Sequence, residues 1–284
     1  MTRSVLARQQ SVRCGRGGAA PTAPLLRSAY DNELGRHIYR AAGGLAALAG
    51  VCAYDADQQP LAQRHLFSAL RLAKASGDRE FGAYIVALLA NQALFLDENR
   101  LVVQYVESAL RAAGPRPIPA LATDLHALAG KAYARMTDGP ACRASLRRSE
   151  RSAARIGPGQ GPAEMSYVMP GLVETQVAEA LRRLGDLRAA LRYAEEAVRT
   201  ADATHLRGQV HRYAGLALVL TAGGSHDRGA HIAGQMLDHA VGMESGRIRD
   251  RINTVVRALR PHAAEPAVAA FLKRADEDAR VRGI

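Results

Sequence analysis

The side chains best suited to chemistry in this 284-residue chain are an asparagine and cations on successive helical segments. Asn91 and Lys131 lie 40 residues apart, and Arg135 follows Lys131 by about one helical turn. An amide together with lysine and arginine side chains can hold a carboxylate through charge-assisted hydrogen bonds. These residue types favour binding of an acidic or C-terminal peptide carboxylate. The alternative is a solvated basic face on an arginine-rich protein.

The sequence motifs that support catalysis are missing. No Gly-x-Ser-x-Gly or His-Glu-x-x-His sequence occurs. Glu195 and Glu196 are adjacent, so they point away from each other on a helix and cannot act as an acid–base pair. The glycine-rich stretch 156–162 has neither the strand before it nor the helix after it that a phosphate-binding loop needs. We therefore expect no enzyme activity and no cofactor.

Metal ligands are not evident from residue spacing. The closest histidine pairs are His205/His211, His226/His231 and His231/His239. None of them has the four-residue spacing that places two imidazoles on one helix face. The cysteines Cys14, Cys52 and Cys142 are far apart and odd in number, which argues against a disulfide framework or a CxxC site. We expect no metal site.

The net charge of +11 raises the question of nucleic-acid binding. Only three of the 38 basic residues are lysines, in a chain rich in alanine and glycine, which is the bias that a GC-rich genome imposes. The arginines are scattered over most helical segments instead of forming one stripe. Direct DNA or RNA binding is therefore not favoured.

The composition also indicates the cellular location and the domain organisation of the chain. No apolar run reaches the roughly 18 residues that a membrane span needs, and the N-terminal segment lacks the apolar core of a signal peptide. We expect a cytoplasmic protein without membrane contact. Residues 1–28 carry five arginines and no acid, and we expect a disordered basic tail there. Residues 29–284 are expected to form one helical repeat domain.

A pattern of small-x3-apolar-x2-small residues recurs about every 40 positions in that domain. It occurs at Ala62/Leu66/Ala69, Val102/Val106/Ala109, Cys142/Leu146/Ser149, Ala190/Ala194/Ala197 and Ala230/Gly234/Leu237. Twelve residues before each lies Gly50, Ala90, Gly130, Ala178 or Leu218. Recurring units of this length indicate stacked helical hairpins.

Turn residues separate the expected helices. Inner turns are predicted at 55–60, 97–99, 138–140, 185–186 and 223–225, and turns between repeats at 76–78 and 114–119. The extra residues between the third and fourth repeats fall in 156–162, where we expect a mobile loop. Two further helices are expected at about 245–260 and 266–280, and the last one suits a polar cap.

The repeat resembles the tetratricopeptide pattern, most clearly in GDLRAALRYAEEAV at 185–198. More narrowly, segments 62–96, 211–240 and 257–275 resemble Streptomyces-type, XRE-like transcriptional regulators of actinobacteria. Those proteins carry an N-terminal helix-turn-helix, which has no counterpart in this sequence. The resemblance implies an all-α fold: a right-handed α-α superhelix, or solenoid, of about five hairpins with C-terminal capping helices.

In tetratricopeptide folds the first helix of each pair lines a concave groove. In that register the resemblance assigns the groove to Tyr84, Asn91, Phe95, Asp124, Lys131, Arg135, Arg182, Arg183 and Arg212. It thereby implies a non-enzymatic module that binds a protein or peptide in transcriptional or developmental regulation. The alternatives are a small-ligand or signal-peptide sensor, and direct DNA binding through the arginine-rich tail. Homodimerisation through a terminal helix stays open.

Overall fold

The computed structural model describes residues 31–157, 161–200 and 205–281. Within these ranges every regular element is helical and no strand occurs, which confirms the all-α prediction. The expected disordered tail at 1–28 lies outside the described residues. None of the described helices combines the length and apolarity that crossing a bilayer requires.

The helices follow the predicted hairpin order. They are α1 (Asn32–Asp55), α2 (Gln59–Ser76), α3 (Arg79–Phe95), α4 (Asn99–Ala113), α5 (Pro119–Arg135), α6 (Gly139–Ala153), α7 (Leu172–Arg183), α8 (Leu187–Arg199), α9 (Leu206–Ala222), α10 (His226–Ala240), α11 (Gly246–Leu259) and α12 (Pro266–Val281). Two short 3-10 helices, η2 (Ala163–Met165) and η3 (Arg260–His262), lie between them. All five inner turns were placed correctly from the sequence.

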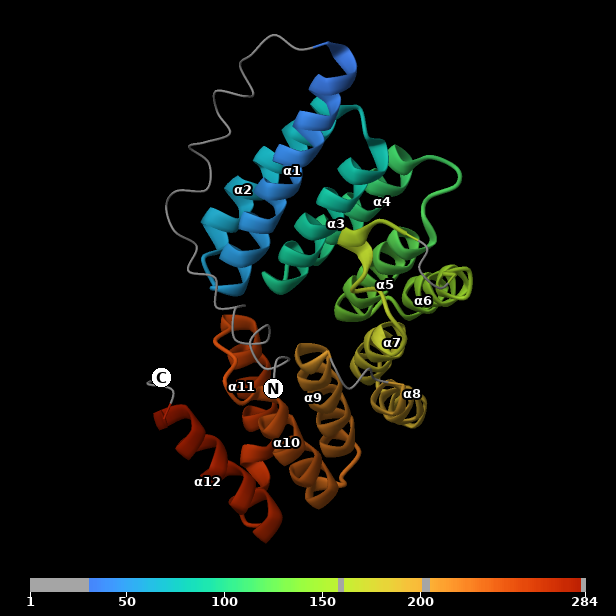
Figure 1. Cartoon of the computed structure of the whole chain (residues 1–284). Coiled ribbons are helices and arrows are strands. Elements are labelled where there is room, and N and C mark those ends of the chain that lie inside the picture. Colours follow the sequence, from blue (N-terminus) through green and yellow to red (C-terminus); the bar gives the residue numbers. More distant parts are fainter. Residues whose placement is uncertain (1–30, 158–160, 201–204, 282–284) are drawn as a thin grey trace.

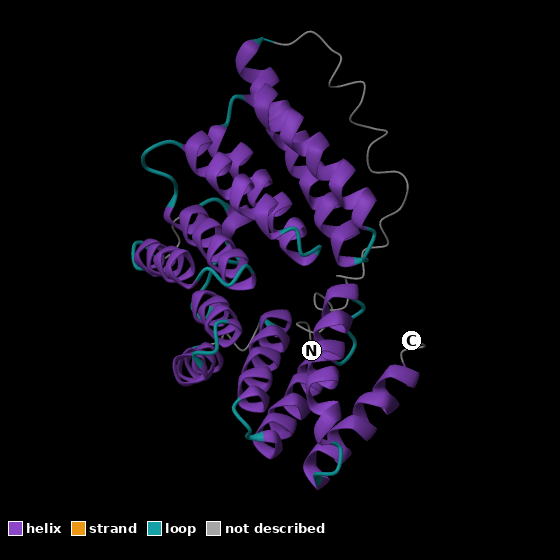
Figure 2. Ribbon diagram, turned by 180° about the vertical axis from the view of Figure 1, so that it is seen from behind, coloured by secondary structure: helices purple, strands orange, loops and turns teal. Residues whose placement is uncertain are grey.

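Each odd-numbered helix up to α9 pairs with the helix that follows it, giving five hairpins. The first helices of successive hairpins also pack on one another, α1 on α3, α3 on α5, α5 on α7 and α7 on α9, and α11 packs on α9. These first helices form an inner layer, flanked by the second helices (Figure 1). Seen from behind, the chain follows a curve that brings α11 back towards the lower end of α1 (Figure 2).

The recurring small-x3-apolar-x2-small stripe is what packs each hairpin. Ala62, Leu66 and Ala69 are at most 2% exposed, and the equivalent residues of the next three repeats are buried as well. The fifth repeat departs at Gly234, which is only partly buried. A Cβ at Gly130 would lie 2.6 Å from Leu146 Cδ2, so glycine there permits the close crossing of α5 and α6.

The inner turns share one backbone solution. The residues with positive φ are Asp57, Asp97, Thr137, Gly185 and Gly224. The amide of the residue after each donates to the carbonyl five positions earlier, at 2.9–3.0 Å, as in a Schellman helix end. All five inner turns therefore have the same backbone geometry, even where the residue with positive φ is not glycine.

The insertion between the third and fourth repeats was expected to be a mobile loop. Its residues 158–160 lie outside the described ranges, but the segment that follows packs on α3 and α5. Met165 and Val168 are buried in the core that those helices share. Gly171, with φ of 85°, is the N-cap residue of α7. The second half of the insertion is thus part of the inner layer.

Candidate functional site

A carboxylate surrounded by cations lies at the centre of the inner layer. Glu179 of α7 accepts from Lys131 of α5 at 3.1 Å and from Arg251 of α11 at 3.3 Å. Arg135, one turn after Lys131, lies 3.9 Å from the other oxygen of Glu179. Two helices, α5 and α11, thereby direct three positive charges at one negative charge on α7.

The electrostatics of this group follow from its partial burial. Burial by itself would raise the pKa of Glu179, but Lys131, Arg251 and Arg135 outweigh it and hold that pKa well below its usual range. Burial lowers the pKa of Lys131, and Arg251 adds to that effect while Glu179 opposes it. The carboxylate of Glu179 is therefore ionised. Its single negative charge compensates only part of the positive charge of Lys131, Arg135 and Arg251.

Further cations enlarge the group towards α1. Arg207 of α9 forms an ion pair with Asp55 at the end of α1. Ser245, which caps α11, donates to the same carboxylate at 2.8 Å. Arg247 of α11 lies over the ring of Tyr54, with its guanidinium carbon 4.5 Å from the ring centroid. The last inner helices therefore contact the end of the first one.

The excess of positive charge also affects the pKa values of neighbouring titratable groups. Burial lowers the pKa of His211, and Arg251, Arg247 and Arg207 push it further down, so this imidazole is neutral at pH 7. Burial likewise lowers the pKa of Arg182, while Glu179 opposes the shift.

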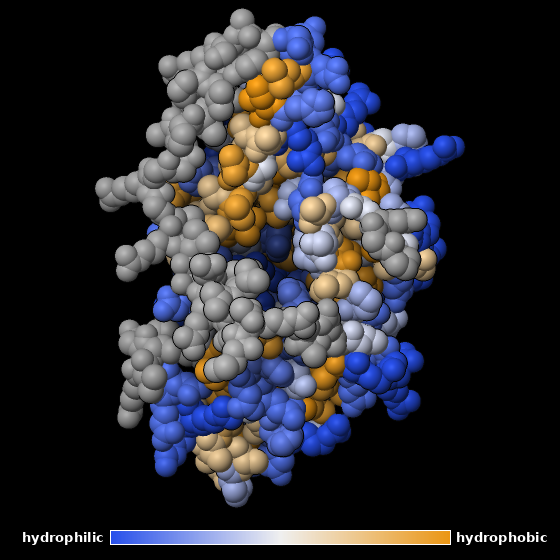
Figure 3. Space-filling view, in the orientation of Figure 1, coloured by the Kyte–Doolittle hydropathy of each residue, from blue (hydrophilic) through white to orange (hydrophobic). Residues whose placement is uncertain are grey.

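We call this group the inner basic cluster. Its cations are Lys131, Arg135, Arg182, Arg207, Arg247 and Arg251, and the acids paired with them are Asp55, Asp97 and Glu179. The molecule is hollowed near the middle of the face in Figure 3, and the atoms visible in that recess are hydrophilic. The cations of this cluster can bind an anion.

A second polar group lies between the inner helices and the insertion. Tyr167 donates to Asp124 of α5 at 2.7 Å. Burial raises the pKa of Asp124 to about 6, although Tyr167 and Lys131 act in the opposite direction. Burial also raises the pKa of Tyr84 to about 12, helped by Glu164 and Asp124. Glu164 forms an ion pair with Arg40 of α1, which ties the insertion to the first helix.

The structure brings together three of the nine residues predicted for the groove, Lys131, Arg135 and Arg182, around Glu179. Tyr84 and Asp124 belong to the second polar group. The backbone carbonyl of Asn91 accepts from Tyr54 at 3.5 Å.

Arg183 and Arg212 lie apart from these groups, whereas Phe95 borders the inner basic cluster through Tyr54. Phe95 packs edge-to-face on Tyr54, with ring centroids 5.5 Å apart. Arg212 is 4% exposed and donates to the carbonyl of Pro170 at 2.9 Å, so it supports the start of α7 instead of facing solvent. Arg183 is exposed at the end of α7. The groove register predicted that Asp124 and Arg212 line an exposed surface. In the structure both side chains are buried.

Sequence reasoning missed the residues that complete the inner basic cluster. These are Asp55, Asp97, Glu179, Arg207, Arg247 and Arg251. The spacing of Arg247 and Arg251 by one helical turn was an available signal, since it places like charges on one face of a helix. Nothing in the sequence indicated that α1 and α11 would meet.

Comparison with protein-family models gave no match to this chain, and none of the curated proteins matches it either.

Proposed function

We propose that this chain is a non-enzymatic, tetratricopeptide-like protein that binds an acidic peptide or a C-terminal carboxylate at the inner basic cluster. The proposed architecture is a right-handed solenoid of the five hairpins, with α11 and α12 as its C-terminal cap. The stacking of the first helices and the repeated turn geometry support it. The inner layer would then be the concave binding face.

The observation that carries the proposal is the imbalance of charge around Glu179. Lys131 and Arg135 on α5, like Arg247 and Arg251 on α11, are pairs of like charges one turn apart, which is unfavourable within a helix. Partial burial weakens the solvent screening of these charges. A carboxylate from a partner would relieve the repulsion and accept from donors that are already in place.

The biological setting is proposed from the resemblance to XRE-like actinobacterial regulators. In this setting the protein acts in the cytoplasm, in transcriptional or developmental regulation, and its bound partner conveys the signal. The recurrence of the hairpin units over residues 32–240 supports an interaction scaffold.

A small anionic ligand is the second candidate, and one contact favours it. Asp55 meets Arg207 and Ser245, so the first and last inner helices touch beside the inner basic cluster. Such closure suits an occupant with a compact acidic group, as a metabolite sensor or signal-peptide sensor would require.

The test uses a short fluorescein-labelled oligoglutamate with a free C-terminus, followed by fluorescence anisotropy. Lys131→Met should weaken binding by about 10- to 100-fold, since a hydrogen bond to a charged group is lost. Glu179→Gln should tighten binding, because it removes the carboxylate that competes with the ligand. Arg188→Met, on the exposed surface of the outer helix α8, is the control for a change of net charge.

Equal affinities of Lys131→Met and Arg188→Met would show that the oligoglutamate binds by net charge alone and would overturn the site. Citrate and inorganic phosphate in a thermal-shift assay address the second candidate. A rise in melting temperature with citrate, lost in Lys131→Met, would favour the small-ligand function over the peptide.

A further inference from the structure

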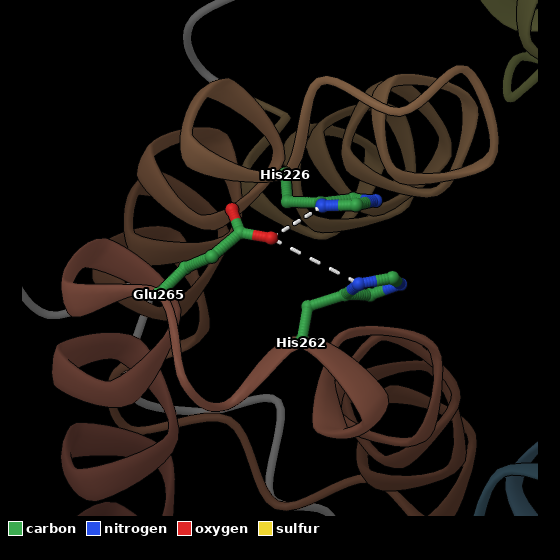
Figure 4. A group of neighbouring side chains, drawn as sticks. All are labelled: His226, His262 and Glu265. Atoms are coloured by element: carbon green, nitrogen blue, oxygen red, sulfur yellow. Dashed lines mark hydrogen bonds and ion pairs between the residues drawn. The ribbon is translucent and has the colours of Figure 1, made fainter.

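Two histidines and a glutamate from three separate elements meet near the C-terminal end of the described chain (Figure 4). His226 opens α10, His262 ends η3, and Glu265 directly precedes α12. The Nδ1 atom of His226 lies 2.6 Å from Oε1 of Glu265, and Nδ1 of His262 lies 3.9 Å from the same oxygen. One potential ligand atom from each residue lies within 4.8 Å of the others.

The orientation of the rings is set by their contact. The imidazoles of His226 and His262 are stacked, with centroids 3.5 Å apart and planes inclined by 22°. Both rings present their Nδ1 edge to Glu265 (Figure 4). The side chains are between 19% and 38% exposed, so an ion can reach them while neighbouring atoms limit their movement.

We propose that His226, His262 and Glu265 bind a divalent transition-metal ion, with Zn²⁺ as the best-suited ion. Two imidazoles and one carboxylate are a three-ligand set that zinc accepts, with water as the fourth ligand. Tetrahedral ligands about 2.0–2.2 Å from an ion are about 3.3 Å apart. The separations of 2.6 and 3.9 Å lie on either side of that value, and binding would also rotate the stacked rings so that both Nδ1 atoms point at one ion.

The backbone around the three residues is held by local structure. Gly224 and Ser225 fix the turn before His226, and the amide of Ser225 donates to the Leu220 carbonyl at 2.9 Å. The amide of Glu265 donates to the His262 carbonyl at 3.0 Å, which sets the distance between those two ligands. Because the backbone of the ligand residues is ordered before an ion arrives, the ordering cost of binding is limited to the side chains.

A bound ion would join the turn before α10 to the turn before α12. Helix α12 already packs on α10 through Val268 and Phe271, which are at most 4% exposed. The ion would act as a structural clamp on the last helix and would stabilise the folded chain by an amount that grows with the logarithm of its free concentration above Kd. This site is separate from the inner basic cluster and does not depend on the function proposed there.

The experiment titrates the full chain, stripped with EDTA and dialysed, with Zn²⁺ by isothermal calorimetry at neutral pH. His262→Gln and Glu265→Gln should each weaken Zn²⁺ binding by at least about tenfold. His231→Gln, which changes an exposed histidine of α10 outside the group, is the matched control and should bind as the unaltered chain does. Circular dichroism of each metal-free variant verifies that it folds.

Co²⁺ absorption gives a readout independent of affinity. The unaltered chain should show the visible bands of tetrahedral cobalt without a thiolate charge-transfer band, because no cysteine takes part, and His262→Gln should lose them. Absence of saturable Zn²⁺ binding to the unaltered chain would overturn the proposal. Unchanged Zn²⁺ affinity in both folded site variants would overturn it as well, since the contact between these side chains would then be structural only.

Discussion

Arg207 of α9 forms an ion pair with Asp55 of α1 although 152 residues separate them in the sequence. The Ser245 hydroxyl donates to the same carboxylate. Ser245 is also the N-cap of α11, where its hydroxyl oxygen accepts from the Ile248 amide. One acidic side chain therefore fixes the relation between the first hairpin and the last inner helices. This contact bounds one side of the inner basic cluster, so it links the stability of the fold to the shape of the candidate site.

Replacing Asp55 should loosen this contact. Asp55→Ala leaves Arg207 next to the like charge of Arg247 and removes the acceptor of Ser245. We expect a loss of about 1–2 kcal/mol of unfolding free energy in urea, as for other hydrogen bonds to a charged group. Hydrogen exchange should accelerate at the end of α1 and the start of α11. Asp250→Ala, at an exposed position of α11, is the control, and equal exchange in both variants would contradict the prediction.

Asp124 should make stability depend on pH. Its pKa in the folded chain is about 6, above the ordinary 3.8, because burial penalises the charged form. The folded state thus holds the proton more tightly than the unfolded state, and the stability from this group is lost as pH rises through 6. Asp124→Asn mimics the protonated form and should stabilise the chain at pH 7.5 by about 2 kcal/mol.

The same substitution should have almost no effect near pH 4, where Asp124 of the unaltered folded chain is already protonated. Denaturant unfolding of both proteins at several pH values measures the difference and cancels contributions from other groups. Asp138→Asn changes an exposed N-cap in the same way and controls for the loss of one negative charge. A gain from Asp124→Asn that is equal at pH 4 and pH 7.5 would rule out a buried ionised carboxylate as its cause.

The hairpins could be predicted from sequence because local chemistry repeats in them. Gly50 and Gly130 lie 80 residues apart, and each packs against a leucine sixteen positions later, Leu66 or Leu146. A Cβ at either glycine would clash with that leucine. A requirement for small residues at a crossing leaves a periodic trace that can be found without a structure. The turn residues leave the same kind of trace, which is why all five inner turns were located.

The candidate sites could be predicted only in part. Lys131 and Arg135 follow the repeat register, but Glu179, which organises them, is one of two acids in α7 and nothing in the sequence sets it apart from Glu174. Its partner Arg251 lies 72 positions later, and that pairing depends on the curvature of the stack. The same limit applies to His226 and Glu265, which come together only because α12 folds back on α10.

The turn geometry itself can be tested by exchanging residues between repeats. Thr137 has φ of 61°, a conformation that costs a β-branched residue about 1–3 kcal/mol, whereas Gly185 occupies the equivalent turn with φ of 81° and open space around it. Thr137→Gly should therefore raise the unfolding free energy by about 1 kcal/mol, after the greater entropy of glycine in the unfolded chain offsets part of the relief.

The reverse exchange, Gly185→Thr, should lower the unfolding free energy by a similar amount. A Cβ there would meet no atom within 4 Å, so backbone strain is the main change expected in the folded state. Asp138 and Asp186 cap the following helices in the same manner, each accepting from the amide three residues on, so the two turns are well matched. Thermal and urea unfolding of both variants should give changes of opposite sign. Destabilisation by both would mean that the threonine hydroxyl, which donates to the Met136 carbonyl at 2.6 Å, outweighs the strain at φ 61°.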